Sequence, residues 1–137
     1  MKRCQKAPRR GAATVEFAFC VPLLAFLMVI AVDWARIFYY SVTVTNAARN
    51  GALYASDPIG RTMSIYSNVT DAALAEATDL SPPPSVSSAN GTDGSGNAFV
   101  TVTVSWQFPL VTSYPGISNP TTLTRTCQMR VAPTVPR

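Results

Sequence analysis

Hydrophobic residues fill a long stretch near the start of the chain, directly after a short polar segment. From Ala12 to Val32 the residues are apolar or small apart from Glu16, with Pro22 near the middle. The stretch is about as long as the ~20 residues that a helix needs to cross a bilayer core. A proline is tolerated in such a helix as a kink. The pattern therefore predicts a transmembrane helix at 12–33.

The helical pattern continues past this stretch and predicts one helix from Ala12 to Ser56, which Asp57 and Pro58 end. Such a helix is roughly 67 Å long, with half in the membrane and half projecting from it. Aromatic residues follow the apolar run, as in a belt at the outer interface: Trp34, Phe38, Tyr39 and Tyr40. Two stripes at helical spacing are predicted to face opposite ways. The polar stripe is Arg36, Thr43, Asn46 and Asn50, and the small-to-apolar stripe is Trp34, Phe38, Ser41, Val42, Thr45, Ala48 and Ala52.

Apolar residues recur at threes and fours over residues 62–80, which predicts a second helix. The face that it would bury is Ile65, Tyr66, Val69, Ala72, Ala73, Ala77 and Leu80. Glu76 falls inside this face, against the pattern. Three prolines at 82–84 end the predicted helix as a stiff extended spacer.

Alternation of apolar and polar residues over 99–108 predicts a half-buried antiparallel strand. Its buried face is Val100, Val102, Val104, Trp106 and Phe108. The segments 85–89 and 123–131 predict two further strands. The last strand buries Leu123, Cys127, Met129 and Val131, with Arg125 as the misfit. The glycine-rich segment 90–97 predicts a mobile hairpin loop, and 109–120 a long connection.

Together these elements predict an α+β fold. The projecting half of the long N-terminal helix packs with the second helix on one face of a small three-stranded antiparallel sheet. Three strands alone bury too little surface to be stable, so the long helix is expected to cover them. The chain divides into a leader at 1–11, a transmembrane helix at 12–33 and an exported domain at 34–137.

Positive charge is concentrated before the apolar stretch. Five of the eleven basic residues lie in the first ten positions, and the first acid is Glu16. From residue 12 onward, six arginines accompany seven acids, a net charge of −1. A basic tail beside a membrane segment sets its orientation, with the N-terminus in the cytoplasm and the rest exported. The overall charge of +4 therefore does not indicate nucleic-acid binding.

Candidate catalytic and metal-binding residues are few. The chain has no histidine, which excludes histidine-based triads and histidine metal sites. Asp71, Glu76 and Asp79 do not share a helix face, and Asp93 lacks the further acids of an EF-hand loop. The three cysteines lie in the basic tail, the apolar helix and the last strand, so no disulfide is expected. We expect no enzymatic activity, no metal site and no cofactor.

The junction between leader and helix resembles a type IV prepilin signal. Gly11 is followed by Ala12, and Glu16 is the fifth residue counted from Ala12, with Phe17 next. The resemblance implies that a prepilin peptidase cuts after Gly11, that Glu16 pairs with the new amine, and that Glu16 and Phe17 serve subunit assembly. The alternative, from the residues alone, is that Gly11 is a flexible break and Glu16 a carboxylate that reaches the interface; the position between a basic leader and an apolar span favours the signal. A secretory signal peptide fits less well, because the apolar run is long and no small-residue cleavage site follows it.

Two blocks support a closer resemblance. Residues 10–24 contain RGAATVEFA followed by PLL, and residues 46–55 read NAARNGALYA. They resemble the TadE-like family, pseudopilins of the tight-adherence (Flp-type) pilus system. This chain departs mildly from the family's pattern at two places. The family often has an acid followed by Gly-Arg where this chain has Asp33-Trp34-Ala35-Arg36, and it commonly has Glu at the position of Asn50. Small residues such as Gly51 are expected to let another element approach closely, since glycine costs roughly 1 kcal/mol in a helix.

The resemblance implies a type IV pilin-like fold and a role as a pseudopilin or minor pilin in pilus assembly, adhesion or secretion. The implied partners are the prepilin peptidase, other pilins and membrane components of the pilus machinery. The implied location is the bacterial cell envelope, as a single-pass inner-membrane protein or in a pilus. The alternative is an exported ligand-binding domain on an uncleaved anchor, with contacts through the loops 90–97 and 111–120. Cleavage after Gly11 separates the two, because an anchor requires none.

Overall fold

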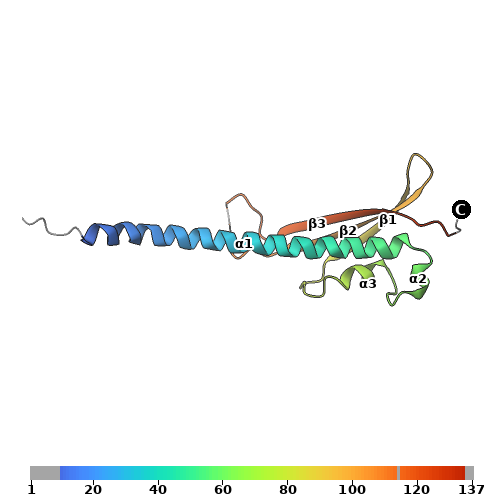
Figure 1. Ribbon diagram of the computed structural model, residues 1–137, viewed down its shortest axis with the longest axis horizontal. Coiled ribbons are helices and arrows are strands. Elements are labelled where there is room, and N and C mark those ends of the chain that lie inside the picture. Colours follow the sequence, from blue (N-terminus) through green and yellow to red (C-terminus); the bar gives the residue numbers. More distant parts are fainter. Residues whose placement is uncertain (1–9, 114, 135–137) are drawn as a thin grey trace, which may run out of the picture.

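The computed structural model describes residues 10–113 and 115–134. Its elements are α1 (Arg10–Ser56), α2 (Gly60–Met63), α3 (Val69–Leu74), β1 (Ser85–Thr92), β2 (Ala98–Phe108) and β3 (Thr121–Arg130). Figure 1 shows α1 as a long rod, with the sheet and the short helices gathered around its C-terminal half. The predicted α+β fold is confirmed. Most of the predicted leader, residues 1–9, lies outside the described residues.

The long helix α1 runs without interruption for 47 residues, and Pro22 lies inside it. It ends at Ser56, as predicted, because the next residue turns the chain. The Asp57 carboxylate accepts hydrogen bonds from the backbone N–H groups of Ile59 at 3.0 Å and Gly60 at 2.9 Å. Aspartate favours such local hydrogen bonds to backbone over a continued helix.

The three strands form an antiparallel sheet in the order β1-β2-β3. Every second residue of β2 is buried, as predicted: Val100, Val102, Val104, Trp106 and Phe108. Threonine and serine side chains line the opposite face and pair across the strands, Thr103 with Thr126 at 3.0 Å and Ser105 with Thr124 at 2.9 Å. The sheet is thus apolar toward the helices and polar on its other face.

Helix α1 lies over β2 and β3, and α3 packs against both α1 and β1. Gly51 permits the close approach, because a Cβ atom there would lie 3.1 Å from Ala73 Cβ and 3.2 Å from Val102 Cγ1. Nearby, Asn50 Nδ2 donates a hydrogen bond to the carbonyl oxygen of Ala72 at 2.6 Å. The packing role expected for Gly51 is confirmed.

Aromatic rings close the core at the end nearer the exposed half of α1. Tyr40 lies with its ring centroid 5.0 Å from that of Trp106 and 5.7 Å from that of Phe108. Trp106 Nε1 donates to the carbonyl oxygen of Pro82 at 2.8 Å, which pins the proline segment to the sheet. Tyr40 therefore belongs to the core, while Trp34, Phe38 and Tyr39 of the predicted aromatic belt are exposed.

The predicted stripes of α1 were partly wrong. The residues of α1 that are buried or half-buried against the rest of the domain include Asp33, Ile37, Tyr40, Val44, Ala47, Ala48, Gly51, Ala52 and Ala55. Ala48 and Ala52 were predicted correctly, but Trp34, Phe38, Val42 and Thr45 face outward. Because alanine and valine side chains are small, the side of α1 that carries them can approach the sheet more closely than the side that carries Trp34 and Phe38. The side with small residues is therefore the one that is buried.

The single helix predicted over 62–80 was also wrong. Two short helices, α2 and α3, take its place, and Ile65 between them is exposed. The reason is a new helix start at Asn68, whose backbone is extended and whose side chain accepts a hydrogen bond from the N–H of Asp71 at 2.8 Å. Glu76 no longer conflicts with the pattern, because α3 ends at Leu74. The residues correctly predicted as buried are Ala72, Ala73, Ala77 and Leu80.

Strand β1 continues to Thr92, so the predicted loop at 90–97 is shorter than expected. Gly91 pairs with Phe99, whose ring lies directly over it and occupies the place of a side chain. The turn that remains is built on Asp93, which accepts hydrogen bonds from the N–H groups of Ser95 and Asn97 and from Asn97 Nδ2. The Asn97 side chain, and then its backbone N–H, lower the pKa of Asp93.

Candidate functional site

The N-terminal half of α1 leaves its apolar side chains exposed. Among them Phe17 is 66 % exposed, Phe19 78 % and Met28 70 %. Within the described residues, this is the one helix long and apolar enough to cross a membrane. An apolar helix surface of this size is stable only against lipid or against other helices.

The predicted site residues all lie on this bare part of α1. Gly11 and Ala12 are in its first turn, and Glu16 and Phe17 follow about one turn later. Glu16 and Phe17 are exposed. A Cβ atom at Gly11 would have no heavy atom within 4 Å. The structure thus leaves Gly11, Glu16 and Phe17 accessible to another molecule.

A buried carboxylate marks the boundary between the bare helix and the folded domain. Asp33 is 1 % exposed, although it follows directly after the apolar run. Its Oδ1 accepts the backbone N–H of Val111 at 3.1 Å, and its Oδ2 accepts that of Thr112 at 3.3 Å. Arg36 Nη1 lies 3.3 Å from Oδ1, and the Arg36 guanidinium also stacks 5.0 Å from the Phe108 ring centroid. Asp33 therefore fastens the connection between β2 and β3 to α1.

In the sequence, Asp33 stands out only as the first charge after the apolar run, and this junction was not predicted. Its partners lie 78 and 79 positions further along the chain. One sequence signal pointed to them, since the whole segment between Phe108 and Arg125 contains no charge. An uncharged loop of this length fits a place beside apolar surface.

Next to Asp33, an apolar hollow of about 370 Å³ opens between α1 and the β2–β3 connection. Its walls are Ile30, Asp33, Trp34, Ile37, Leu110, Ile117 and Thr121. Ile30 belongs to the apolar run, so the hollow continues the lipid-type surface of α1 into the base of the domain.

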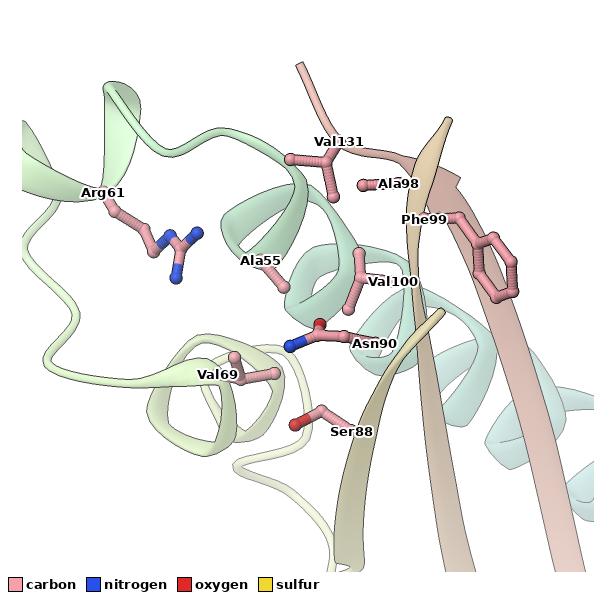
Figure 2. A pocket seen from close by; sticks show the side chains of 9 residues that line it. All are labelled: Ala55, Arg61, Val69, Ser88, Asn90, Ala98, Phe99, Val100 and Val131. Atoms are coloured by element: carbon pink, nitrogen blue, oxygen red, sulfur yellow. The ribbon is translucent and has the colours of Figure 1, made fainter. Parts of the chain in front are cut away.

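A second hollow of about 330 Å³ lies at the far end of the domain (Figure 2). Arg61 is the charged residue among those that line it, and its guanidinium points toward the space above Val69 and Asn90. The remaining lining is mostly small and apolar. The pocket lacks a paired acid and base, so its side chains offer binding contacts rather than groups for proton transfer. Among the described residues, no three His, Cys, Asp or Glu side chains gather as metal ligands would.

Fold and site together define a class: an α+β protein whose described residues include one N-terminal helix long and apolar enough to span a membrane, with the folded domain packed on the other half of that helix. The family model described as TadE-like protein matches residues 11–53, which cover α1 almost to its end. The resemblance to the TadE-like family is thereby confirmed over these residues. Neither a curated protein nor a solved structure matches the chain.

Proposed function

We propose that this protein is a minor pilin, or pseudopilin, of a tight-adherence pilus. In this role it assembles through α1 with other pilins and supports pilus assembly, adhesion or secretion. The observation that carries the proposal is the bare N-terminal half of α1, with Glu16 and Phe17 exposed on it. The TadE-like match over residues 11–53 supports it independently.

Processing and topology form part of the same proposal. A prepilin peptidase removes residues 1–11 by cutting between Gly11 and Ala12. The basic leader stays in the cytoplasm, and the α+β domain is exported to the periplasm or the cell surface. The protein acts by assembly rather than by catalysis.

The competing function is an exported ligand-binding domain on an uncleaved anchor. The pocket beside Arg61 favours it, because a guanidinium over small apolar side chains offers an anion a partner. Such a domain needs neither a charge at position 16 nor a cut after residue 11. Variants at these two positions therefore separate the two functions.

Glu16 tests the assembly role. Cleavage creates an amine on Ala12, and a carboxylate in an apolar helix costs roughly 2.5–3.5 kcal/mol at the bilayer centre unless it is paired. The Glu16→Gln change keeps the size of the side chain but removes the charge. We expect the variant to be cut and inserted normally, but to capture far fewer partner pilins in membrane crosslinking.

The matched control is Glu76→Gln, which removes an exposed carboxylate from the folded domain. It should crosslink to partners as the wild type does. Equal partner capture by the wild type and Glu16→Gln would show that Glu16 is only a tolerated interfacial charge.

A further inference from the structure

Contacts with α1 hold the connection between β2 and β3 at the end of the apolar run. This connection spans residues 109–120, and residue 114 is not among those described. The backbone N–H groups of Val111 and Thr112 bind Asp33, the first residue after the apolar run. In Figure 1 the orange loop lies beside α1, ahead of the strands and toward the bare half of the helix. If the apolar run spans the bilayer, this loop lies at the level of the lipid headgroups.

The composition of the loop suits that level. It carries no charge, and its flanks add none until Arg125. Val111 is 67 % exposed and Ile117 52 % exposed, so two branched aliphatic side chains point away from the protein core. The turn at the opposite end of the domain, residues 93–97, is Asp-Gly-Ser-Gly-Asn and has no apolar side chain.

Four backbone polar groups at the start of the loop are paired within the protein. Asn119 Oδ1 accepts the N–H of Leu110 at 3.1 Å, and Asn119 Nδ2 donates to the carbonyl oxygen of Leu110 at 3.3 Å. Asp33 accepts the next two N–H groups. An unpaired backbone group is costly to remove from water, and these hydrogen bonds remove that cost for the four groups that they pair.

We propose that the loop between β2 and β3, in its described residues 109–113 and 115–120, is a second membrane contact of this protein. Val111 and Ile117 insert among the lipids at the outer interface beside α1, and the apolar hollow that Ile30, Trp34 and Leu110 help to line opens to the same lipids. Asp33 holds the loop in place, so the contact fixes the height and the rotation of the domain above the bilayer. The proposal rests on the membrane anchoring of α1 that is part of the proposed function.

Depth-dependent quenching of a probe on the full chain tests this contact. In a chain with all native cysteines replaced by serine, single changes Val111→Cys, Ile117→Cys and Ser95→Cys each receive the fluorophore NBD. Both aliphatic positions are more than half exposed, so the changes leave the core intact. The proteins are placed at low density in phosphatidylcholine–phosphatidylglycerol vesicles that contain lipids with a doxyl group high on the acyl chain. The Ser95 probe, on the opposite turn, is the matched control.

We expect the probes at 111 and 117 to emit at shorter wavelength and to lose most of their emission to the doxyl lipids, while iodide quenches only the probe at 95. Equal iodide quenching at 95, 111 and 117 would overturn the proposal. Protection of 111 and 117 only at high protein density would also overturn it, because another protein would then cover the loop. A probe on native Cys20, in a chain that keeps this cysteine alone, must report lipid; if it does not, the anchoring itself fails. A lipid signal at Cys20 with water at 111 and 117 would overturn the loop contact and leave the proposed function standing.

Discussion

Asp33 shows how one residue joins the two parts of this molecule. A carboxylate at the end of a membrane span has to be paired or hydrated, because a charge beside apolar surface is costly. Here two backbone N–H groups and the Arg36 guanidinium supply the pairing, so that the side chain is buried without being unsatisfied. The same hydrogen bonds fix the loop 109–120 against α1. The end of the apolar run and the base of the domain are therefore joined at Asp33.

Gly51 sets the distance between α1, α3 and the sheet. A side chain larger than hydrogen meets Ala73 and Val102 at close range. We expect Gly51→Leu to destabilise the domain by about 1–3 kcal/mol, the usual cost of overpacking, despite the higher helix propensity of leucine. The measurement is thermal unfolding of the detergent-solubilised chain, followed by circular dichroism.

The control for Gly51 is Gly94→Leu. A Cβ atom at Gly94 has no heavy atom within 4 Å, so the same chemical change meets open space there. Its melting temperature should stay close to that of the wild type. A Gly51→Leu variant that melts with the wild type would show that α3 is free to move away and that the contact is not tight.

At the scale of elements, α1 serves two purposes with two of its faces. Its inner face supplies Val44 and a run of alanines to the core. Its outer face keeps an apolar stripe that continues from the bare half: Trp34, Phe38, Val42 and Leu53 are all more than half exposed. The helix thus covers the sheet with its inner face and leaves an apolar outer face exposed, which in the proposed function binds other pilins.

Removing the helix tests its place in the core. A fragment that begins at Ser56 uncovers the buried face of β2, and each large apolar side chain contributes roughly 1.5–3 kcal/mol when buried. We expect this fragment to aggregate. A fragment that begins at Asp33 retains the inner face of α1 and should be monomeric with a cooperative melt. Size-exclusion chromatography with circular dichroism compares the two, and a monomeric, cooperatively melting Ser56 fragment would contradict the account.

Local patterns predicted the elements better than they predicted their contacts. The β2 face from Val100 to Phe108 and the end of α1 at Ser56 followed from alternation and from a strong helix stop, both of which depend on neighbours in sequence. The break at Asn68 was missed because apolar spacing carried the prediction across a side chain that caps a new helix. The buried stripe of α1 was misplaced because large aromatic residues were assigned to the inner side.

The candidate site divides in the same way. Gly11, Glu16 and Phe17 are found by order and spacing in sequence, and the structure adds that they are accessible. The Asp33 junction depends on residues 78 and 79 positions away, and no local period encodes such a distance. Hydrophobic patterning therefore predicts the apolar half of α1, whereas the fold alone places the loop beside the end of that half.

In the molecule as a whole, the C-terminal half of α1 carries the folded domain, and the N-terminal half leaves its apolar side chains exposed. This division suits a subunit that is held in the membrane before assembly and bound to other helices afterwards. In the proposed function the change between the two states begins with removal of the leader. The proposed function therefore depends first on cleavage after Gly11.

The most direct test is the N-terminal sequence and the intact mass of the protein recovered from cells that express it with its pilus machinery. We expect a mature chain that begins at Ala12, and an uncut precursor for Gly11→Leu, because a side chain there keeps the peptidase from the backbone. Gly94→Leu should be cut normally, since both glycines lie in open space and neither change disturbs the fold. A mature chain that still begins at Met1, or a Gly11→Leu variant of normal mature size, would contradict the account.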